Sequence, residues 1–333
     1  MEYRTFGATG LQVSAIGLGA FPLSGMQAQS DGQLRGWTGT DDREAVALIH
    51  RGEELGVNLI DTAESYGSGH SEIITGKALS GRRERWVVAT KVSPFTKTRP
   101  NVGSEGSPLT ASTARQRIME ACEGSLRRLK MDYIDLYQLH AIPAEPTMPA
   151  VMEALSTLRQ QGKVRWYGIS TNDHAAVEQL RALGPIDVLQ IGYNLLEREA
   201  DALLHWCREE QIGTLIRVPL AKGMLTGKYV GANAAVVPDN DVRYDRFRKP
   251  ESVEALQKLP QLNYLAEGTG RMMPQAALRF VLDHPGVSCV IAGAKNPQQI
   301  EGNAASVDVP PLSEAELQQA LEIADTIRTP GWT

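Results

Sequence analysis

The chain contains 333 residues, of which 42% are hydrophobic and 22% charged, and its formal net charge at pH 7 is −5. This length lies within the range of one α/β barrel, so we expect a single domain over residues 1–333. The negative charge and the lack of a long basic run argue against a nucleic acid or an anionic membrane as partner. They favour a small-molecule ligand.

The three cysteines, Cys122, Cys207 and Cys289, lie far apart and have neither a disulfide framework nor a zinc-knuckle spacing. We expect buried thiols. No apolar run approaches the ~20 residues needed to span a bilayer, and the amino-terminal residues lack the apolar core of a signal peptide. The expected location is therefore cytoplasmic.

Short apolar runs alternate with amphipathic stretches along most of the chain, which predicts repeated βα units. Residues 2–14 predict a small β-hairpin, turning at Ala8-Thr9-Gly10, that covers the bottom of a barrel. Eight strands follow, at residues 15–20, 57–61, 86–91, 133–140, 164–170, 187–192, 214–220 and 287–293. The expected fold class is a (β/α)8 TIM barrel.

The stretches between the strands have helical patterns. Residues 111–131 repeat apolar side chains at i, i+3 and i+4 positions on one face, namely Ile118, Ala121, Cys122, Leu126 and Leu129. After the eighth strand, LSEAELQQALEIADTI predicts an extra C-terminal helix, capped by Ser313 with Glu316 three residues on.

Three segments have no pattern that predicts a helix or a strand: residues 22–41, 93–110 and 228–250. Each is rich in Gly, Pro, Ser or charge, and each follows the carboxyl end of a strand. We expect them to overhang the mouth of the barrel. For residues 93–110, plain surface disorder is the alternative.

Three consecutive strands deliver ionisable side chains at or just beyond their carboxyl ends. Asp61 closes the second strand and Tyr66 follows it, Lys91 closes the third, and His140 closes the fourth. Singly, each could be a turn, cap or wall residue. A lysine that closes an apolar strand needs a carboxylate partner, because desolvating an ammonium is costly, and Asp61 is the obvious one. We therefore expect a reaction centre at the mouth of the barrel.

The chemistry of these four residues suits protonation of an oxyanion formed from a carbonyl. The ammonium of Lys91 would stabilise the phenolate of Tyr66, while Asp61 would hold Lys91 protonated. His140 could polarise a carbonyl oxygen or bridge a proton to Tyr66. A Schiff base on Lys91 is the chemical alternative, but it needs an unpaired amine, which Asp61 argues against.

No zinc-type ligand set is apparent, because the six histidines are scattered and none lies in an HExxH or HxH pattern. We therefore expect no metal. Four histidines fall in helical stretches and are expected to be surface or cap groups: His50, His174, His205 and His284. His70 lies in a glycine-rich loop near Tyr66 and is a weaker candidate for substrate contact.

The ends of the fifth to eighth strands are rich in groups that suit a phosphate-rich cofactor carrying an amide. They comprise hydrogen-bonding side chains, lysines and flexible glycines: Ser170, Asn172, Gln190, Lys222, Lys228, Lys295, Gly223 and Gly227. Residues 296–303 predict a short helix whose amino end favours a phosphate.

Together these motifs give the chain a clear resemblance over residues 2–325 to the aldo-keto reductase superfamily, NAD(P)H-dependent carbonyl reductases built on a TIM barrel. The matching pieces are YRTFGATGLQVSAIGLGA, LIDTAESYGSGHSE, ATKV, YIDLYQLH, YGIS, LQIGYN, PLAKGMLTGKY and VIAGAKNPQQIEGN. The absence of GxGxxG after a strand fits a reductase that binds its dinucleotide without a Rossmann fold.

The resemblance implies a role for each candidate residue. Tyr66 would be the general acid, Lys91 and Asp61 the pair that tunes it, and His140 the orienting group. The implied contacts to NADP(H) are Ser170, Asn172 and Gln190 at the carboxamide; Leu220, Lys222, Gly223 and Lys228 at the pyrophosphate; and Lys295, Gln299 and Asn303 at the 2′-phosphate and adenine. Gly19, Ala20 and Gly293 complete the cofactor-binding set.

Two positions depart from the family pattern. Thr171 separates Ser170 from Asn172, where the family often has Asn directly after Ser. Arg217 stands where many members stack a tyrosine on the nicotinamide, and its charge would disfavour the oxidised ring or reach a pyrophosphate or an acidic substrate.

The expected function is reduction of an aldehyde or ketone by NADPH. Overhanging aromatic side chains would contact the substrate: Phe21, Trp37, Phe95 and Tyr229. Two alternatives stay open, namely a cofactor-binding regulatory subunit of the same fold and an isomerase or aldolase on the same barrel.

Overall fold

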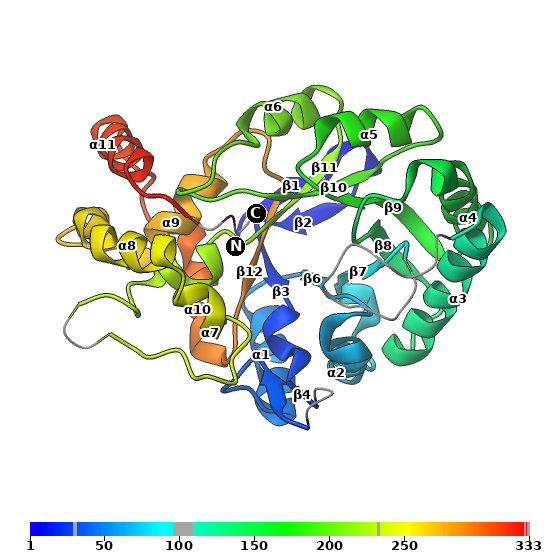
Figure 1. The fold of residues 1–333 in the computed structure, drawn as a ribbon, viewed down its shortest axis with the longest axis horizontal. Helices are drawn as coiled ribbons and strands as arrows, with labels where there is room; N and C mark the ends of the chain where they lie inside the picture. The colour runs from blue at the N-terminus through cyan, green and yellow to red at the C-terminus, as the bar shows by residue number, and fades with distance from the viewer. Residues whose placement is uncertain (29–31, 96–108, 232–233, 330, 332–333) are drawn as a thin grey trace.

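The computed structural model describes residues 1–28, 32–95, 109–231, 234–329 and 331. Eight parallel strands form a closed barrel in the order β10-β11-β12-β3-β6-β7-β8-β9 (Figure 1). The strands are β3 (Ile16–Gly19), β6 (Leu59–Asp61), β7 (Val87–Val92), β8 (Ile134–Leu139), β9 (Val164–Ser170), β10 (Val188–Gly192), β11 (Gly213–Arg217) and β12 (Cys289–Gly293). The predicted TIM barrel is confirmed, and each predicted strand overlaps one of these.

Every residue of β6, β7 and β8 is buried, because strands of a parallel barrel are covered on both faces. Helices pack around the outside (Figure 1): α1 (Asp42–Glu54), α2 (His70–Ala78), α3 (Ala111–Leu129), α4 (Met148–Gln160), α5 (His174–Arg181), α6 (Asp201–Glu209), α9 (Met273–Leu282) and α10 (Pro297–Ala304). The predicted apolar face of α3 is buried, and Thr110 caps the first turn of this helix.

An antiparallel hairpin of β1 (Tyr3–Thr5) and β2 (Gln12–Ser14) covers one end of the barrel, as predicted (Figure 1). Its turn ends at Gly10, whose φ of 74° favours glycine. Phe6 is fully buried and packs in one cluster with Val188 and Leu215, close to the amino ends of their strands. The hairpin therefore closes the amino-terminal end of the barrel.

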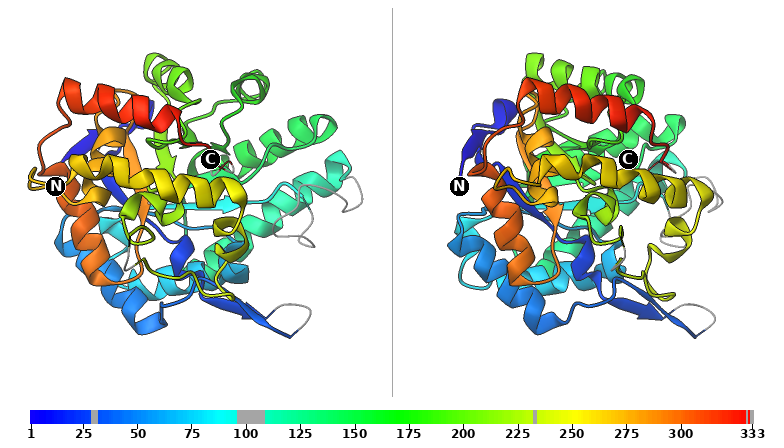
Figure 2. Two further views of the ribbon diagram at one scale, coloured as in Figure 1. Left: turned by 60° about the vertical axis from the view of Figure 1, so that its left-hand side comes forward. Right: turned by 90° about the vertical axis from the view of Figure 1, so that its left-hand side faces the viewer.

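The predicted C-terminal helix is α11 (Glu314–Asp325), which lies on the outside of the barrel (Figure 2). Ser313 and Glu316 form the predicted capping box. Ala320 and Ala324 of α11 belong to a second apolar cluster that also contains Leu259, Leu262 and Leu265. No helix in the described parts of the chain has the length and apolar character that crossing a bilayer requires.

Two of the three segments expected to lack secondary structure contain some, so this expectation is corrected. Residues 22–41 include a ribbon of β4 (Met26–Ala28) and β5 (Leu34–Gly36), which projects from the barrel in Figure 2. Residues 228–250 include α7 (Tyr244–Phe247) and lead into α8 (Pro250–Lys258). These elements are too short to give a periodic sequence signal. Most of the third segment, at 96–108, lies outside the described residues.

The first two segments meet across the mouth. Gly36 N–H donates to Asn240 O at 3.0 Å, and Val242 N–H donates to Gly36 O at 2.9 Å. We call residues 34–38 together with residues 239–243 the strap. It joins two loops that are some 200 positions apart in the chain, as the 203-residue separation of the hydrogen-bonded pair Thr38 and Asp241 shows.

Candidate active site

Asp61, Tyr66, Lys91 and His140 meet at the carboxyl ends of β6, β7 and β8, as the sequence predicts. The Lys91 ammonium is fully buried and uses three acceptors: Asp61 Oδ2 at 2.6 Å, Thr62 O at 2.9 Å and Tyr66 Oη at 3.1 Å. The Tyr66 and His140 rings lie edge to face with centroids 5.6 Å apart. These contacts hold a phenol, an ammonium and an imidazole around one point.

A layer of amides below the site fixes the Asp61 carboxylate. Asp61 Oδ1 accepts hydrogen bonds from Gln138 Nε2 at 3.1 Å and from Gln190 Nε2 at 2.9 Å. Ser170 Oγ in turn lies 3.5 Å from Gln190 Oε1. Both carboxylate oxygens are therefore occupied, which offsets the cost of burying this charge.

The pKa values of the site follow from burial and from the neighbouring charges. Burial raises the pKa of Tyr66, and the Lys91 charge opposes part of this rise. Burial alone would lower the pKa of Lys91, but Asp61 and Tyr66 outweigh it, so that this pKa is raised. Tyr66 and Lys91 are both protonated at neutral pH.

His140 is a neutral imidazole. Burial, together with the positive charges of Lys91 and Arg217, lowers its pKa to about 3. Ser65 Oγ lies 3.3 Å from His140 Nδ1 and is its hydrogen-bond partner. His140 therefore hydrogen-bonds at the mouth without carrying a charge.

A cavity of about 840 Å³ opens above these residues. It is large enough for a cofactor part together with a small substrate. Most of the predicted residues line it: Gly19, Asp61, Tyr66, His140, Ser170, Gln190, Arg217, Leu220, Lys222, Gly223, Lys228, Gly293, Lys295, Gln299 and Asn303, with Phe21, Trp37 and Tyr229 from the overhanging loops.

A few predicted residues are not among those that line the cavity: Lys91, Ala20, Asn172 and Phe95. Lys91 lies behind Tyr66 and donates a hydrogen bond to its hydroxyl at 3.1 Å. The amide of Asn172 joins neighbouring strand ends, since it donates to Gly192 O at 2.9 Å and accepts from Gly192 N–H at 2.8 Å. This pairing leaves a direct contact between Asn172 and a cofactor as a prediction.

The far end of the cavity is basic. Its lining includes Lys222, Lys228, Arg243 and Lys295. Burial, with neighbouring cations, lowers the pKa of Lys222 and that of Lys295 to about 8 each. Asp61 is the one carboxylate among the described residues that line the cavity, so this group of cations suits a polyanion.

The strap supplies part of this basic end. The buried Asp241 accepts from Arg243 Nε at 2.8 Å and Nη2 at 2.9 Å, and from Thr38 Oγ1 at 2.9 Å. Lys295 Nζ donates to Thr38 O at 2.6 Å. The Arg243 guanidinium lies over the Trp37 ring, 4.6 Å from its centroid. The Asp241 carboxylate thus links the two parts of the strap, and Arg243, Trp37 and Lys295 lie around this link.

The loop after β11 is strained. Val218, Ala221 and Lys222 have φ values of 57°, 47° and 52°, in the left-handed region that glycine favours. Each costs on the order of 1–3 kcal/mol, and such residues cluster at functional sites. The buried Asn194 helps to hold the loop by donating to Val218 O at 3.3 Å.

Arg217 ends β11 and lines the cavity. Within the described residues it forms no ion pair with a carboxylate, and its guanidinium lies 3.5 Å from Asn172 Oδ1. Burial lowers its pKa, with Tyr66 and Glu197 opposing. Arg217 therefore does not form a salt bridge to a described loop carboxylate.

Three residues that contribute to the site were not predicted from the sequence. Gln138 lies in β8 two positions before His140, which directly follows the strand, and strand alternation would have placed both on the same face. Ser65 directly precedes Tyr66 but gave no signal of its own. Arg243 lies in a segment without periodicity, so its approach to the cavity follows only from the fold.

The expectation that His284 is a surface or cap group is wrong. It follows α9 and is 9% exposed. The three cysteines are buried, as predicted.

A model of the Aldo/keto reductase family matches residues 16–325. The chain belongs to the aldo/keto reductase family. It is 34% identical to "Aldo-keto reductase YhdN" of Bacillus subtilis over 90% of this chain and 87% of that protein. Among solved structures, the aldo/keto reductase described as glycerol dehydrogenase AKR11B4 from Gluconobacter oxydans is 29% identical, covers 99% of this chain and 98% of its own, and has a TM-score of 0.77.

Two further relatives bear on the alternatives left open by the sequence. The "NADH-specific methylglyoxal reductase" of Escherichia coli is 29% identical over 98% of this chain and 99% of its own. The "Probable voltage-gated potassium channel subunit beta" of Oryza sativa is 30% identical over 97% of this chain and 96% of its own. The chain is therefore an aldo/keto reductase related to oxidoreductases. Family membership does not decide between NADH and NADPH, so the choice of cofactor depends on the chain's own residues.

Proposed function

We propose that this aldo/keto reductase reduces an aldehyde or ketone to the alcohol with NADPH as hydride donor and Tyr66 as proton donor. The observation that carries the proposal is the hydrogen bond of 3.1 Å from the buried Lys91 ammonium to the Tyr66 hydroxyl, at the wall of a cavity of about 840 Å³. A phenol supported by a fixed cation is suited to giving its proton to a carbonyl oxygen.

The residues around the cavity fit a nicotinamide dinucleotide phosphate. Ser170 and Gln190 offer hydrogen-bonding groups for a carboxamide beside the catalytic residues, and Lys222, Lys228 and Lys295 offer charge for phosphates. Asn296 caps α10, and Asn296, Gln298 and Gln299 at the amino end of this helix line the same cavity. The reduced nicotinamide, when bound, supplies the hydride.

The chain's own residues manage the proton and the developing charge. Tyr66 donates its O–H to the carbonyl oxygen as negative charge develops there, and its phenolate is stabilised by Lys91. Asp61 keeps Lys91 protonated through this change. Neutral His140 donates a hydrogen bond to the same oxygen and orients it, since its pKa of about 3 keeps it uncharged.

We assign the substrate side of the cavity to the aromatic residues Phe21, Trp37 and Tyr229. Phe21 packs on Tyr66 with ring centroids 4.7 Å apart and on Trp37 at 5.3 Å. An apolar wall next to the proton donor favours a carbonyl compound with a hydrophobic body.

The experiment is a screen of cofactor oxidation, followed at 340 nm, with the purified protein, a panel of aldehydes and ketones, and either NADPH or NADH. We expect carbonyl-dependent oxidation of NADPH, with hydrophobic aldehydes preferred over small polar ones. No turnover with any carbonyl compound would contradict the proposal.

The second candidate is a cofactor-binding regulatory subunit, which the name of the rice relative suggests for this fold. The complete group of Asp61, Tyr66, Lys91 and His140 favours an enzyme, because a binding subunit has no need of a buried ion pair beneath a phenol. Tight NADPH binding without turnover across the whole panel would favour the subunit instead.

A further inference from the structure

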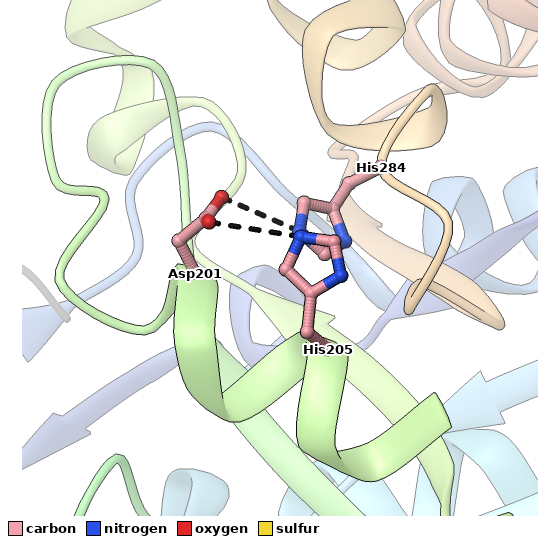
Figure 3. A group of neighbouring side chains, drawn as sticks. All are labelled: Asp201, His205 and His284. Atoms are coloured by element: carbon pink, nitrogen blue, oxygen red, sulfur yellow. Dashed lines mark ion pairs between the residues drawn. The ribbon is translucent and has the colours of Figure 1, made fainter. Parts of the chain in front are cut away.

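A second cluster of ionisable side chains lies outside the cavity, between α6 and the end of α9 (Figure 3). Asp201 is the first residue of α6, and His205 follows one turn later on the same face, with Nε2 3.8 Å from Asp201 Oδ2. His284 reaches the pair from the segment after α9, with Nε2 3.3 Å from Asp201 Oδ1. The potential ligand atoms all lie within 4.8 Å of one another.

The buried member of this cluster is unsatisfied. His284 Nε2 is inaccessible to solvent and forms no hydrogen bond of acceptable geometry, although it points toward the carboxylate (Figure 3). A buried imidazole nitrogen that faces a carboxylate at 3.3 Å without forming a well-aligned hydrogen bond calls for an explanation, and an absent ion is one of the recognised ones.

We propose that Asp201, His205 and His284 form a binding site for a divalent cation of the Zn²⁺ class, separate from the catalytic centre. Two imidazoles and one carboxylate are a ligand set that Zn²⁺ accepts, with a fourth position left for water. Mg²⁺ and Ca²⁺ prefer oxygen ligands and are not favoured here. Bond lengths of about 2.0–2.1 Å in a tetrahedral site separate the ligand atoms by roughly 3.3–3.4 Å. The 3.3 Å between His284 Nε2 and Asp201 Oδ1 already matches this spacing, whereas His205 Nε2, at 3.8 Å from Asp201 Oδ2, has to move closer.

The surroundings hold the ligands in place. Tyr193 donates its O–H to Asp201 Oδ1 at 3.0 Å, and its ring stacks on Phe280 at 5.6 Å and meets the His284 ring edge to face. A carboxylate oriented by an outside hydrogen bond is typical of metal ligands. The side chains of Asp201 and His205 are 55% and 52% exposed, so an ion can enter from solvent.

One contact opposes the proposal. Gly286 N–H donates to His284 Nδ1 at 3.1 Å, which places the ring hydrogen on Nε2. Coordination through Nε2 would move this hydrogen to Nδ1 and break the contact with Gly286. This costs one neutral hydrogen bond, and coordination of the ion by three ligands has to outweigh that loss.

The test is a titration of the chelator-treated full-length protein with Zn²⁺ in competition with a chromophoric chelator. We expect one site in the wild type and a loss of affinity in His205→Ala, larger than the roughly 10–100-fold that removal of an outer-shell partner costs. His205 is exposed, so this variant should fold. His70→Ala is the matched control, because His70 pairs with Asp42 at 2.8 Å without a third ligand in the described residues. It should bind as the wild type does.

A second readout separates coordination from loss of folding. Zn²⁺ should raise the melting temperature of the wild type and of His70→Ala, but not that of His205→Ala or Asp201→Asn. If the wild type binds Zn²⁺ no more tightly than His205→Ala, or if Zn²⁺ stabilises all four proteins equally, the proposal is overturned. Neither outcome depends on carbonyl reduction.

Discussion

At the scale of single residues, the Lys91–Asp61 pair shows what sequence reasoning can predict. An ammonium at the end of an apolar strand needs a counter-charge, and the structure supplies it at 2.6 Å. The same reasoning could not find Arg243, because its position depends on a loop that packs against residues some 200 positions away. It also missed the metal-ligand cluster, whose members come from residues 201 to 284.

The first prediction concerns Lys295 and the 2′-phosphate. Replacing it with Met should reduce a preference for NADPH over NADH by roughly one to two decades, because a charged hydrogen bond to phosphate contributes about 1.5–3 kcal/mol. Dissociation constants for both cofactors can be measured by protein fluorescence. Equal cofactor preference in the wild type and in Lys295→Met would contradict this role.

The affinity for NADPH should also depend on pH through the charge of Lys295. The pKa of Lys295 is about 8, so its charge is present below pH 8 and lost above it, while a bound phosphate would favour the protonated form. The dissociation constant for NADPH should therefore rise above pH 8. Lys222 has the same pKa of about 8, but it should affect both cofactors. The ratio of the two constants isolates Lys295, and Lys295→Arg should remove the trend from this ratio.

The second prediction concerns Arg217. If its guanidinium lies beside the nicotinamide, its charge disfavours the cationic oxidised ring, so NADP⁺ should bind more weakly than NADPH. Arg217→Tyr should narrow the gap between the two dissociation constants at fixed ionic strength, whereas Arg217→Lys should preserve it. An unchanged ratio in Arg217→Tyr would place Arg217 away from the nicotinamide.

At the scale of elements, the barrel strands were predictable because buried parallel strands are short apolar runs bounded by turns. The helix α11 was predictable from its capping box. The β4–β5 ribbon was not, because three-residue strands in a glycine-rich segment have no period. The strap, which combines residues 34–38 with residues 239–243, depends on contacts between segments far apart in the chain. The Asp241–Arg243 pair is the main ion pair that stabilises it.

The third prediction tests this strap. Asp241→Asn would leave the Arg243 guanidinium buried without its counter-charge, which costs on the order of 3–5 kcal/mol. We expect NADPH to dissociate roughly tenfold faster or more, equivalent to about 1.4 kcal/mol, in stopped-flow fluorescence. The control is Asp245→Asn, since Asp245 forms an exposed pair with Arg35 at 3.7 Å. Equal rates in the two variants would show that the strap does not retain the cofactor.

At the scale of the whole molecule, the two ends of the barrel have different tasks. The amino-terminal end is closed by the hairpin and Phe6, while the carboxyl-terminal end holds the reactive side chains. The net charge of −5 argues against a nucleic acid or an anionic membrane as partner, yet the cavity gathers several cations. The net charge of the chain thus does not predict the charge of the cavity, because the fold determines which charged side chains lie close together.

The fourth prediction separates stability from function. Phe6→Ala should lower the free energy of unfolding by about 3–5 kcal/mol, because it empties a fully buried position. At temperatures well below unfolding, NADPH affinity should be unchanged. Phe21→Ala, at the mouth, should show the reverse, with a small loss of stability and weaker substrate binding. Denaturant unfolding and enzyme kinetics test the two variants. A loss of cofactor affinity in Phe6→Ala would contradict the separation of a stabilising end of the barrel from a functional end.

The most direct test of the account is single-turnover reduction by Tyr66→Phe, which removes only the hydroxyl bonded to Lys91 at 3.1 Å. With NADPH bound and the best carbonyl substrate of the screen, we predict that the rate of cofactor oxidation falls by at least roughly 10²-fold while the NADPH dissociation constant stays as in the wild type. A Tyr66→Phe variant that turns over at a near-normal rate would contradict the assignment of Tyr66 as the proton donor.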